Sequence, residues 1–123
     1  MSKKKIKDKI TAYMETLGIY KEQYSESVSI LANMLFDLET AEKEFTKNGR
    51  KFLIEYTNKN GSTNFIKNPN YQIIENLRRD SINVMKELGI TPQGLKKYDE
   101  KLIANEPKSE SILEKVMSLY ESG

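Results

Sequence analysis

The sequence predicts a mainly α-helical fold, with a long helical hairpin-like core, a short β-hairpin or loop excursion, and a C-terminal helix. Two observations lead to this prediction. Apolar residues recur every three or four positions along most of the chain, which is the helical period. Residues 51–67 are instead rich in strand formers on both sides of a turn sequence. The 123 residues are 37% apolar and 31% charged, which fits one polar-surfaced domain with a modest core.

The first predicted helix covers residues 5–17 and ends at Gly18. Its apolar stripe is Ile6, Ile10, Tyr13, Met14 and Leu17. Lysines crowd the beginning of the chain, at Lys3, Lys4, Lys5, Lys7 and Lys9. Residues 1–9 are therefore predicted to form either a basic arm that grips DNA or a solubilising frayed end. No apolar segment follows these lysines, so a secretory signal peptide is not expected.

The longest periodic segment, residues 21–47, predicts a helix of about seven turns that ends at Asn48-Gly49. One seam repeats every seven residues, at Tyr24, Leu31, Leu38 and Phe45. This seam offers more apolar surface than short flanking helices can cover. We therefore expect these four residues to form an interface between subunits, with the core of the subunit itself as the alternative location.

Residues 51–67 predict a β-hairpin or an ordered loop. The stretch FLIEYT is rich in strand formers, NKNGS has turn chemistry, and TNFI suits a return strand. An isolated two-stranded hairpin is marginal in water. The hairpin is therefore expected to need the helices or a neighbouring subunit behind it.

The next helix is predicted from Asn68 to Leu88. Asn68 suits the N-cap, Pro69 the first turn, and Gly89 the left-handed residue after the last turn. Its apolar stripe is Ile74, Leu77, Ser81, Val84 or Met85, and Leu88. Thr91-Pro92 then opens a short basic helical turn that reaches Tyr98.

The C-terminal region is predicted as a linker over residues 99–108, broken by Pro107, followed by a helix. Ser109 suits the cap of that helix, and its apolar side is Ile112, Leu113, Val116, Met117 and Tyr120. The predicted organisation is therefore a helical domain over residues 1–98 and a linker with an amphipathic helix over residues 99–123.

Charge is distributed unevenly. Residues 1–46 hold 7 basic and 8 acidic side chains, a net −1; residues 47–101 hold 11 and 6, a net +5; residues 102–123 hold 2 and 4, a net −2. A local basic field is typical of phosphate binding, although charge runs are often only solvated faces. The candidate DNA-binding residues are Arg78, Arg79, Lys86, Lys96 and Lys97, with Lys67 secondary.

Several kinds of catalysis are excluded by composition. The chain has no cysteine and no histidine, so thiolate nucleophiles, thiolate zinc sites and imidazole acid–base chemistry are absent. It has no phosphate loop of the GxxxxGK type. The pairs Asp37/Glu39 and Asp99/Glu100 diverge on a helix and suit solvated surface. We expect no enzyme activity, no cofactor, no metal and no membrane-spanning segment.

The stretch NPNYQIIENLRRDSINVMKELGITPQGLKKY resembles the signature of the phage terminase small-subunit family. The Tyr-x-x-x-Leu-Gly-Ile segment at Tyr13–Ile19 extends the resemblance over roughly residues 10–98. It implies a ring-forming, non-enzymatic subunit that binds double-stranded phage DNA and the large terminase ATPase–nuclease in the cytoplasm of the bacterial host. Leu95 stands where the family has a first basic residue, and Lys97 matches the second. Lysine there implies point-charge contact with phosphate and not bidentate base reading by this turn.

Two other functions are compatible with the residues. One is a helix-turn-helix transcription regulator, against which stands the shortness of the predicted segment Pro92–Tyr98. The other is an interaction module whose long helix binds a partner. A ring, a dimer and a monomer in solution are the respective expectations.

Overall fold

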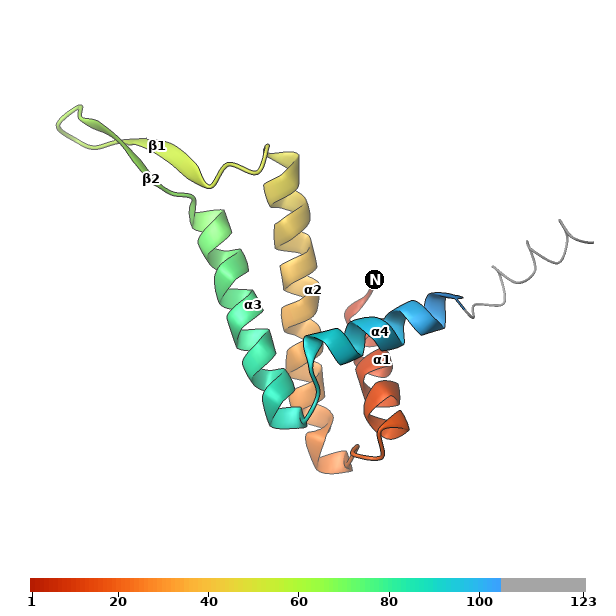
Figure 1. Cartoon of the computed structure of the whole chain (residues 1–123). Helices are drawn as coiled ribbons and strands as arrows, with labels where there is room; N and C mark the ends of the chain where they lie inside the picture. The colour runs from red at the N-terminus through yellow and green to blue at the C-terminus, as the bar shows by residue number, and fades with distance from the viewer. Residues whose placement is uncertain (105–123) are drawn as a thin grey trace, which may run out of the picture. The chain divides into compact units, whose positions relative to one another are not determined.

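A computed structural model describes residues 1–104 of the chain, as two compact units (Figure 1). The first unit is Met1–Ile90, and the second begins at Thr91. In order, the elements are α1 (Lys3–Thr16), the 3₁₀ turn η1 (Glu22–Tyr24), α2 (Ser25–Lys47), β1 (Leu53–Thr57), β2 (Thr63–Lys67), α3 (Pro69–Leu88) and α4 (Pro92–Ala104). The predicted fold class, mainly α with a short β-hairpin, is confirmed.

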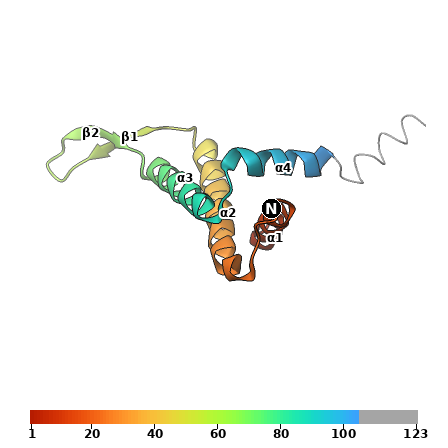
Figure 2. The ribbon, with the colours of Figure 1, turned by 60° about the horizontal axis from the view of Figure 1, so that its bottom comes forward.

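Helix α2 is the centre of the first unit (Figures 1 and 2). Helix α1 packs along the N-terminal half of α2, and α3 returns antiparallel to α2. The core lies between these helices. Its apolar members are Ile6, Ile10, Met14, Val28, Leu31, Ala32, Phe45, Ile74, Met85, Leu88 and Ile90.

Part of the apolar seam of α2 lies in this core and not on the surface of the subunit. Leu31 is fully buried and Phe45 is 2% exposed within the chain itself. We therefore assign these two residues to the subunit core, which corrects their placement in an interface between subunits. Tyr24 and Leu38 are half-buried, and their part in such an interface stays a prediction. A seven-residue apolar repeat is expected both in the core of a subunit and at an interface between subunits. It indicates that the side chains are buried, but not whether the same chain or another subunit covers them.

Two Leu-Gly-Ile corners close one end of the helical unit. Gly18 and Gly89 have φ angles of 73° and 79°, in the left-handed region that favours glycine. In each corner the isoleucine N–H donates back into the helix, from Ile19 to Met14 and from Ile90 to Met85, both at 3.0 Å. The two corners also touch, since a Cβ on Gly89 would lie 3.6 Å from Cδ1 of Ile19.

Asn68 fastens the hairpin to α3 at the other end. Its Oδ1 accepts from the N–H of Asn70 at 3.0 Å, which caps the helix as predicted. Its Nδ2 donates to the carbonyl of Lys51 at 2.9 Å, and its own N–H donates to the carbonyl of Phe52 at 2.8 Å. One side chain therefore holds the entry of β1 and the start of α3 together.

An aromatic cluster supports the same junction. The ring centroids of Phe45 and Phe52 are 5.5 Å apart, and Tyr71 lies 5.3 Å from Phe45 and 4.8 Å from Phe52. Such pairs stabilise beyond their buried area, by about 0.5–1.5 kcal/mol each. The cluster joins the end of α2, the start of β1 and the first turn of α3.

The β-hairpin forms as predicted, with Ile54 opposite Ile66 and Thr57 opposite Thr63. Its turn is built by Asn58, whose Oδ1 accepts from the N–H groups of Asn60 and Ser62 at 3.0 and 3.1 Å. The strands extend away from the ends of α2 and α3 and do not lie along either helix (Figures 1 and 2).

Two predictions about the ends of elements are corrected. Residues 3–9 are not an arm but the first turns of α1, because Ile6 and Ile10 on that helix are buried against α2. Lys3 also contacts α2, because its Nζ lies 5.3 Å from the centre of the Phe36 ring.

The second correction concerns α4, which runs to Ala104 and so includes residues 99–104 of the predicted linker. No glycine or proline interrupts residues 95–104, and the N–H of Gly94 donates to Oγ1 of Thr91 at 3.0 Å, as a cap requires. The predicted boundary after Tyr98 therefore falls inside a helix. The predicted helix around Ile112–Tyr120 lies outside the described residues.

Replacing Asn68 with alanine tests the junction. Asn68→Ala removes the cap and the bond to Lys51, and we expect the free energy of unfolding to fall by about 1–2 kcal/mol. The matched control is Asn70→Ala, an exposed position where the cap uses only the backbone N–H. We expect a change within about 0.5 kcal/mol for the control in urea denaturation. Equal losses in the two variants would contradict this role of Asn68.

Candidate nucleic-acid interface

The solvent-facing side of α3 carries a continuous polar stripe opposite the core. The buried positions of this helix are Ile74, Ser81, Met85 and Leu88. Because each residue turns the helix by about 100°, the opposite side has its own set at spacings of three and four. This set, here called the α3 outer stripe, is Gln72, Asn76, Arg79, Asn83 and Lys86. It extends over most of a helix about 30 Å long.

The α3 outer stripe contains amides and cations, and two carboxylates flank it: Asp80, which pairs with Arg79, and the exposed Glu87, which follows Lys86. Amide side chains pair with adenine edges, arginine pairs with guanine, and all of these groups donate to phosphate oxygens. Gln72 and Asn76 are linked, with Nε2 donating to Oδ1 at 3.0 Å. Arg79 is 65% exposed and bonds only its sequence neighbour Asp80 among the described residues, at 3.2 Å. The stripe therefore offers the donor and acceptor types that read a DNA groove.

The cations predicted to bind DNA in residues 67–86 fall into two groups in the structure, one in ion pairs between elements and one exposed on α3. Arg78 pairs with Glu42 of α2 at 2.7 Å, and Lys67 pairs with Glu75 of α3. These two residues are occupied in joining elements of the chain. The neighbouring Arg79 points about 100° away from Arg78, into the outer stripe. Lys86 is exposed in the same stripe.

Lys96 and Lys97 belong to the second unit. Both are exposed in the first turns of α4. These two consecutive lysines form a basic pair. The short helical turn that was predicted here is part of the longer helix α4. Their contact with DNA stays a prediction.

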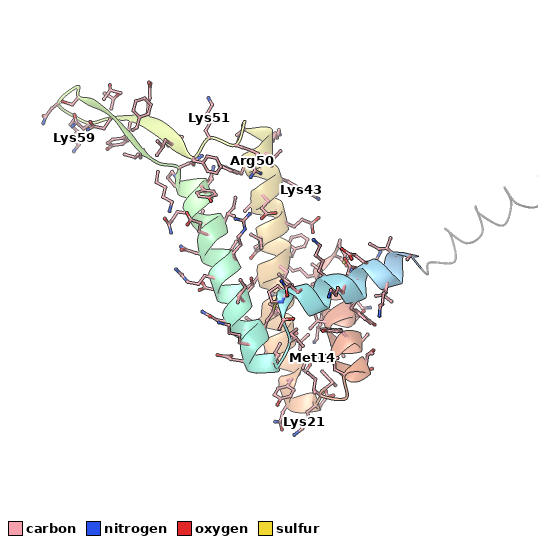
Figure 3. All side chains as sticks on the ribbon, viewed as in Figure 1. Met14, Lys21, Lys43, Arg50, Lys51 and Lys59 are labelled. Carbon is pink, nitrogen blue, oxygen red and sulfur yellow. The ribbon has the colours of Figure 1, made fainter. Side chains whose placement is uncertain are left out.

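Another basic group, which the sequence analysis did not single out, surrounds the hairpin (Figure 3). Arg50 has a φ of 54° and donates to Oγ1 of Thr46 at 3.1 Å, with its guanidinium 5.3 Å from the centre of the Phe45 ring. Lys51 and Lys59 are exposed at the base and in the turn of the hairpin. The amides of the outer stripe were also missed. The signal for them was the same helical spacing that predicted the core, followed on the opposite side of α3.

The described residues were also compared with the requirements of a metal site. No group of three or more carboxylates in residues 1–104 is arranged to hold a metal ion. The pKa of Glu39 is lowered, first by its hydrogen bond to Lys43 at 3.0 Å and then by the charge of that lysine, in a pair at the surface. Among the described helices, none is long and apolar enough to cross a membrane.

Comparison with known proteins gives one result. No curated protein and no solved structure matches the chain. The family described as "Phage terminase, small subunit" matches residues 4–102, which reach from α1 into α4. The match covers the polar stripe of α3, the basic pair of α4 and both Leu-Gly-Ile corners. The chain therefore belongs to the phage terminase small-subunit family.

Proposed function

We propose that this chain recognises viral DNA and recruits it to the large terminase subunit, as a ring of identical copies. Small subunits of phage terminases are in general non-catalytic DNA-recognition components of genome packaging. Membership of that family and the outer stripe of α3 together support the proposal. The large terminase subunit, an ATPase and nuclease, is the proposed second partner.

The α3 outer stripe is the observation that carries the DNA-binding proposal. A nucleic-acid surface needs cations for phosphate and amides or guanidinium groups for bases. Arg79 and Lys86 supply the first, and Gln72, Asn76 and Asn83 the second. The stripe is exposed along its length except for the half-buried Asn76, so DNA can approach it without any change in the core.

Assembly into a ring compensates for the weak charge of one chain. The net charge is only +2. Linked binding sites gain affinity because each later contact is intramolecular. Several copies that each contribute Arg79, Lys86, Lys96 and Lys97 therefore bind DNA more tightly than one copy, with Arg78 and Lys67 as weaker contributors.

A helix-turn-helix regulator is the second candidate function, and one observation favours it. α4 has 13 residues, so the objection that the segment after Thr91 is too short for a recognition helix no longer applies. The mass of the protein in solution separates the two, because such regulators bind paired half-sites as dimers. The family match favours the terminase subunit.

The salt dependence of DNA binding tests the outer stripe. Each phosphate contact adds about 0.9 to the slope of log affinity against log salt concentration, so Arg79→Ala/Lys86→Ala should lower the slope by about 1.8. Lys96→Ala/Lys97→Ala should lower it equally if both lysines touch phosphate. The measurement is a titration of phage-derived duplex DNA at several salt concentrations.

The matched control is Lys43→Ala/Lys47→Ala, which removes the same charge from exposed positions on α2. It should leave the slope nearly unchanged. A loss of slope in the control that equals the loss in the α3 variant would show a general charge effect. No binding by the wild-type protein at low salt would contradict the DNA-binding proposal itself.

The amides make a separate prediction. Asn83→Ala should reduce the preference for the cognate packaging sequence over unrelated DNA, because a base contact is worth about 1–3 kcal/mol of discrimination. It should leave the salt slope unchanged, since an amide neutralises no phosphate. Competition binding with the two DNAs measures this. An unchanged preference in both Asn83→Ala and Asn76→Ala would exclude base reading by the stripe.

The isolated protein should hydrolyse neither nucleotides nor DNA. The sequence holds no phosphate loop, histidine or cysteine, and the described residues hold no carboxylate cluster suited to a metal. Nucleotide hydrolysis and nuclease assays on the purified chain check this. Turnover that a single substitution in this chain abolishes would contradict the prediction, whereas stimulation of a separate ATPase would not.

A further inference from the structure

The β-hairpin is the part of the first unit that the chain leaves least covered. Leu53 is 59% exposed, Phe65 67% and Tyr56 53%, although all three are large apolar or aromatic side chains. The strands pair only with each other in the main contacts of the unit. A free two-stranded hairpin is marginally stable in water, and exposed apolar patches mark interaction sites.

The register assigns the exposed side chains to two faces of the hairpin. Residues opposite each other share a face, so Leu53 and Phe65 lie together on the face of Glu55 and Lys67. The hydroxyls of Thr57 and Thr63, 3.1 Å apart, lie on the same face. This face, here called the Leu53–Phe65 face, is the more exposed one.

The opposite face is supported by the chain itself. It carries Ile54, Ile66 and Tyr56, and its alternation continues back to Phe52. Phe52 belongs to the aromatic cluster, and Ile54 is half-buried. The Leu53–Phe65 face therefore needs a partner more than this face does.

A groove between α2 and α3 offers a complementary surface. It is lined by Asp37, Thr40, Ala41, Glu44, Asn70 and Ile73. Its wall is mainly apolar, with Ile73 half exposed to solvent, and its two charged residues are both acidic. All six lining residues come from α2 and α3, and four of them lie in the second half of α2.

Charge and shape match between the hairpin and this groove. Of the three lysines in residues 51–67, Lys67 pairs with Glu75 of its own chain, so Lys51 and Lys59 against Glu55 leave the hairpin a net +1. Asp37 and Glu44 give the groove −2. A strand of five residues spans about 17 Å, enough to cover the helical segment from Asp37 to Glu44, which is about 10 Å long.

The hairpin cannot fill the groove of its own chain. It extends away from the ends of α2 and α3 and does not fold back along them (Figures 1 and 2). We propose that the Leu53–Phe65 face of each hairpin docks in the Asp37–Ile73 groove of the next copy. The occupant is a second copy of this chain, because the two complementary surfaces are both present on it.

This contact is heterologous, since it joins two different surfaces. Contacts of this type produce closed rings when the rotation closes, or filaments when it does not. The inference rests on the proposed ring assembly, and it names the surfaces that would form the ring. DNA is the less suited occupant, because Leu53 and Phe65 offer it neither charge nor hydrogen bonds.

Two variants test the contact, one on each surface. Phe65→Thr keeps a strand-forming residue on the hairpin and removes the ring. Ile73→Gln keeps a helix-forming residue and makes the groove polar. Because both side chains are exposed in the single chain, each variant should retain its helical circular dichroism. Each should raise the concentration of half-assembly at least about thirtyfold, as the loss of a central interface residue does.

Matched controls are available for both variants. Tyr56→Thr makes an aromatic-to-threonine change on the opposite face of the hairpin. Ile82→Gln repeats the groove substitution on α3 nine residues later, which is half a turn away around the helix. Both controls should assemble like the wild-type protein in size-exclusion chromatography with light scattering.

Mixing the two variants gives the decisive result. Phe65→Thr retains a normal groove, and Ile73→Gln retains a normal hairpin. The mixture should therefore form particles of two chains, with one intact contact, whereas neither variant alone does so. A charge exchange adds to this: Lys59→Glu and Glu44→Lys should each weaken assembly, and the double variant should recover part of it.

Several results would overturn the proposal. These are a wild-type monomer at micromolar concentration, wild-type mass in both Phe65→Thr and Ile73→Gln, or a mixture that stays monomeric. Wild-type mass with lost DNA binding in Phe65→Thr would assign the hairpin to DNA instead. DNA binding is measured in parallel, so that a ring that forms through these surfaces but binds no DNA would refute the proposed function alone.

Discussion

The fold depends on the burial of one side of α2. This helix supplies Val28, Leu31, Ala32 and Phe45 to the core, and both α1 and α3 pack against it. Full burial of one such aliphatic or aromatic side chain stabilises the folded state by about 1.5–3 kcal/mol. Since α1 and α3 bring mainly their own inward stripes to this contact, α2 is the element without which neither has a core.

The same constraint leaves particular surfaces open. Helix α1 packs along the first half of α2, whereas α3 packs along the second half as well. The Asp37–Ile73 groove and the projecting hairpin follow from this asymmetry. The inward side of α3 packs in the core, and its outer stripe faces solvent, where DNA is proposed to bind. The proposed DNA contact and the proposed subunit contact therefore use different surfaces, and substitutions are expected to affect one without the other.

Local chemistry made much of the fold predictable from the sequence. Gly18, Gly89, Asn68 and Thr91 act within one turn of the chain, so their caps and corners could be assigned from neighbouring residues alone. The hairpin followed from strand formers around NKNGS. Contacts between residues far apart in the sequence could not be assigned from neighbouring residues. The burial of Leu31 and Phe45 depends on which partner covers α2, and the capture of Arg78 depends on Glu42, which is 36 residues away.

The candidate site could be predicted only in part, because its definition also depends on contacts between residues far apart in the sequence. Positive charge in the middle of the chain identified Arg79 and Lys86, but charge alone could not separate them from the paired Arg78 and Lys67. The amides carry no charge signal, and their alignment with Arg79 becomes significant only when the buried side of α3 is fixed. The extent of α4 was missed because residues 99–104 are polar enough to suit a linker, although they contain no helix breaker.

The absence of cysteine from the chain permits a direct test of the α3 surface. Asn83→Cys places a single thiol in the centre of the outer stripe, and its rate of alkylation can be measured with and without saturating phage-derived duplex DNA. We expect DNA to slow this reaction strongly, because the proposed interface places the stripe against the duplex. An alkylation rate that is the same for the free protein and the fully formed DNA complex would contradict the proposed DNA interface on α3.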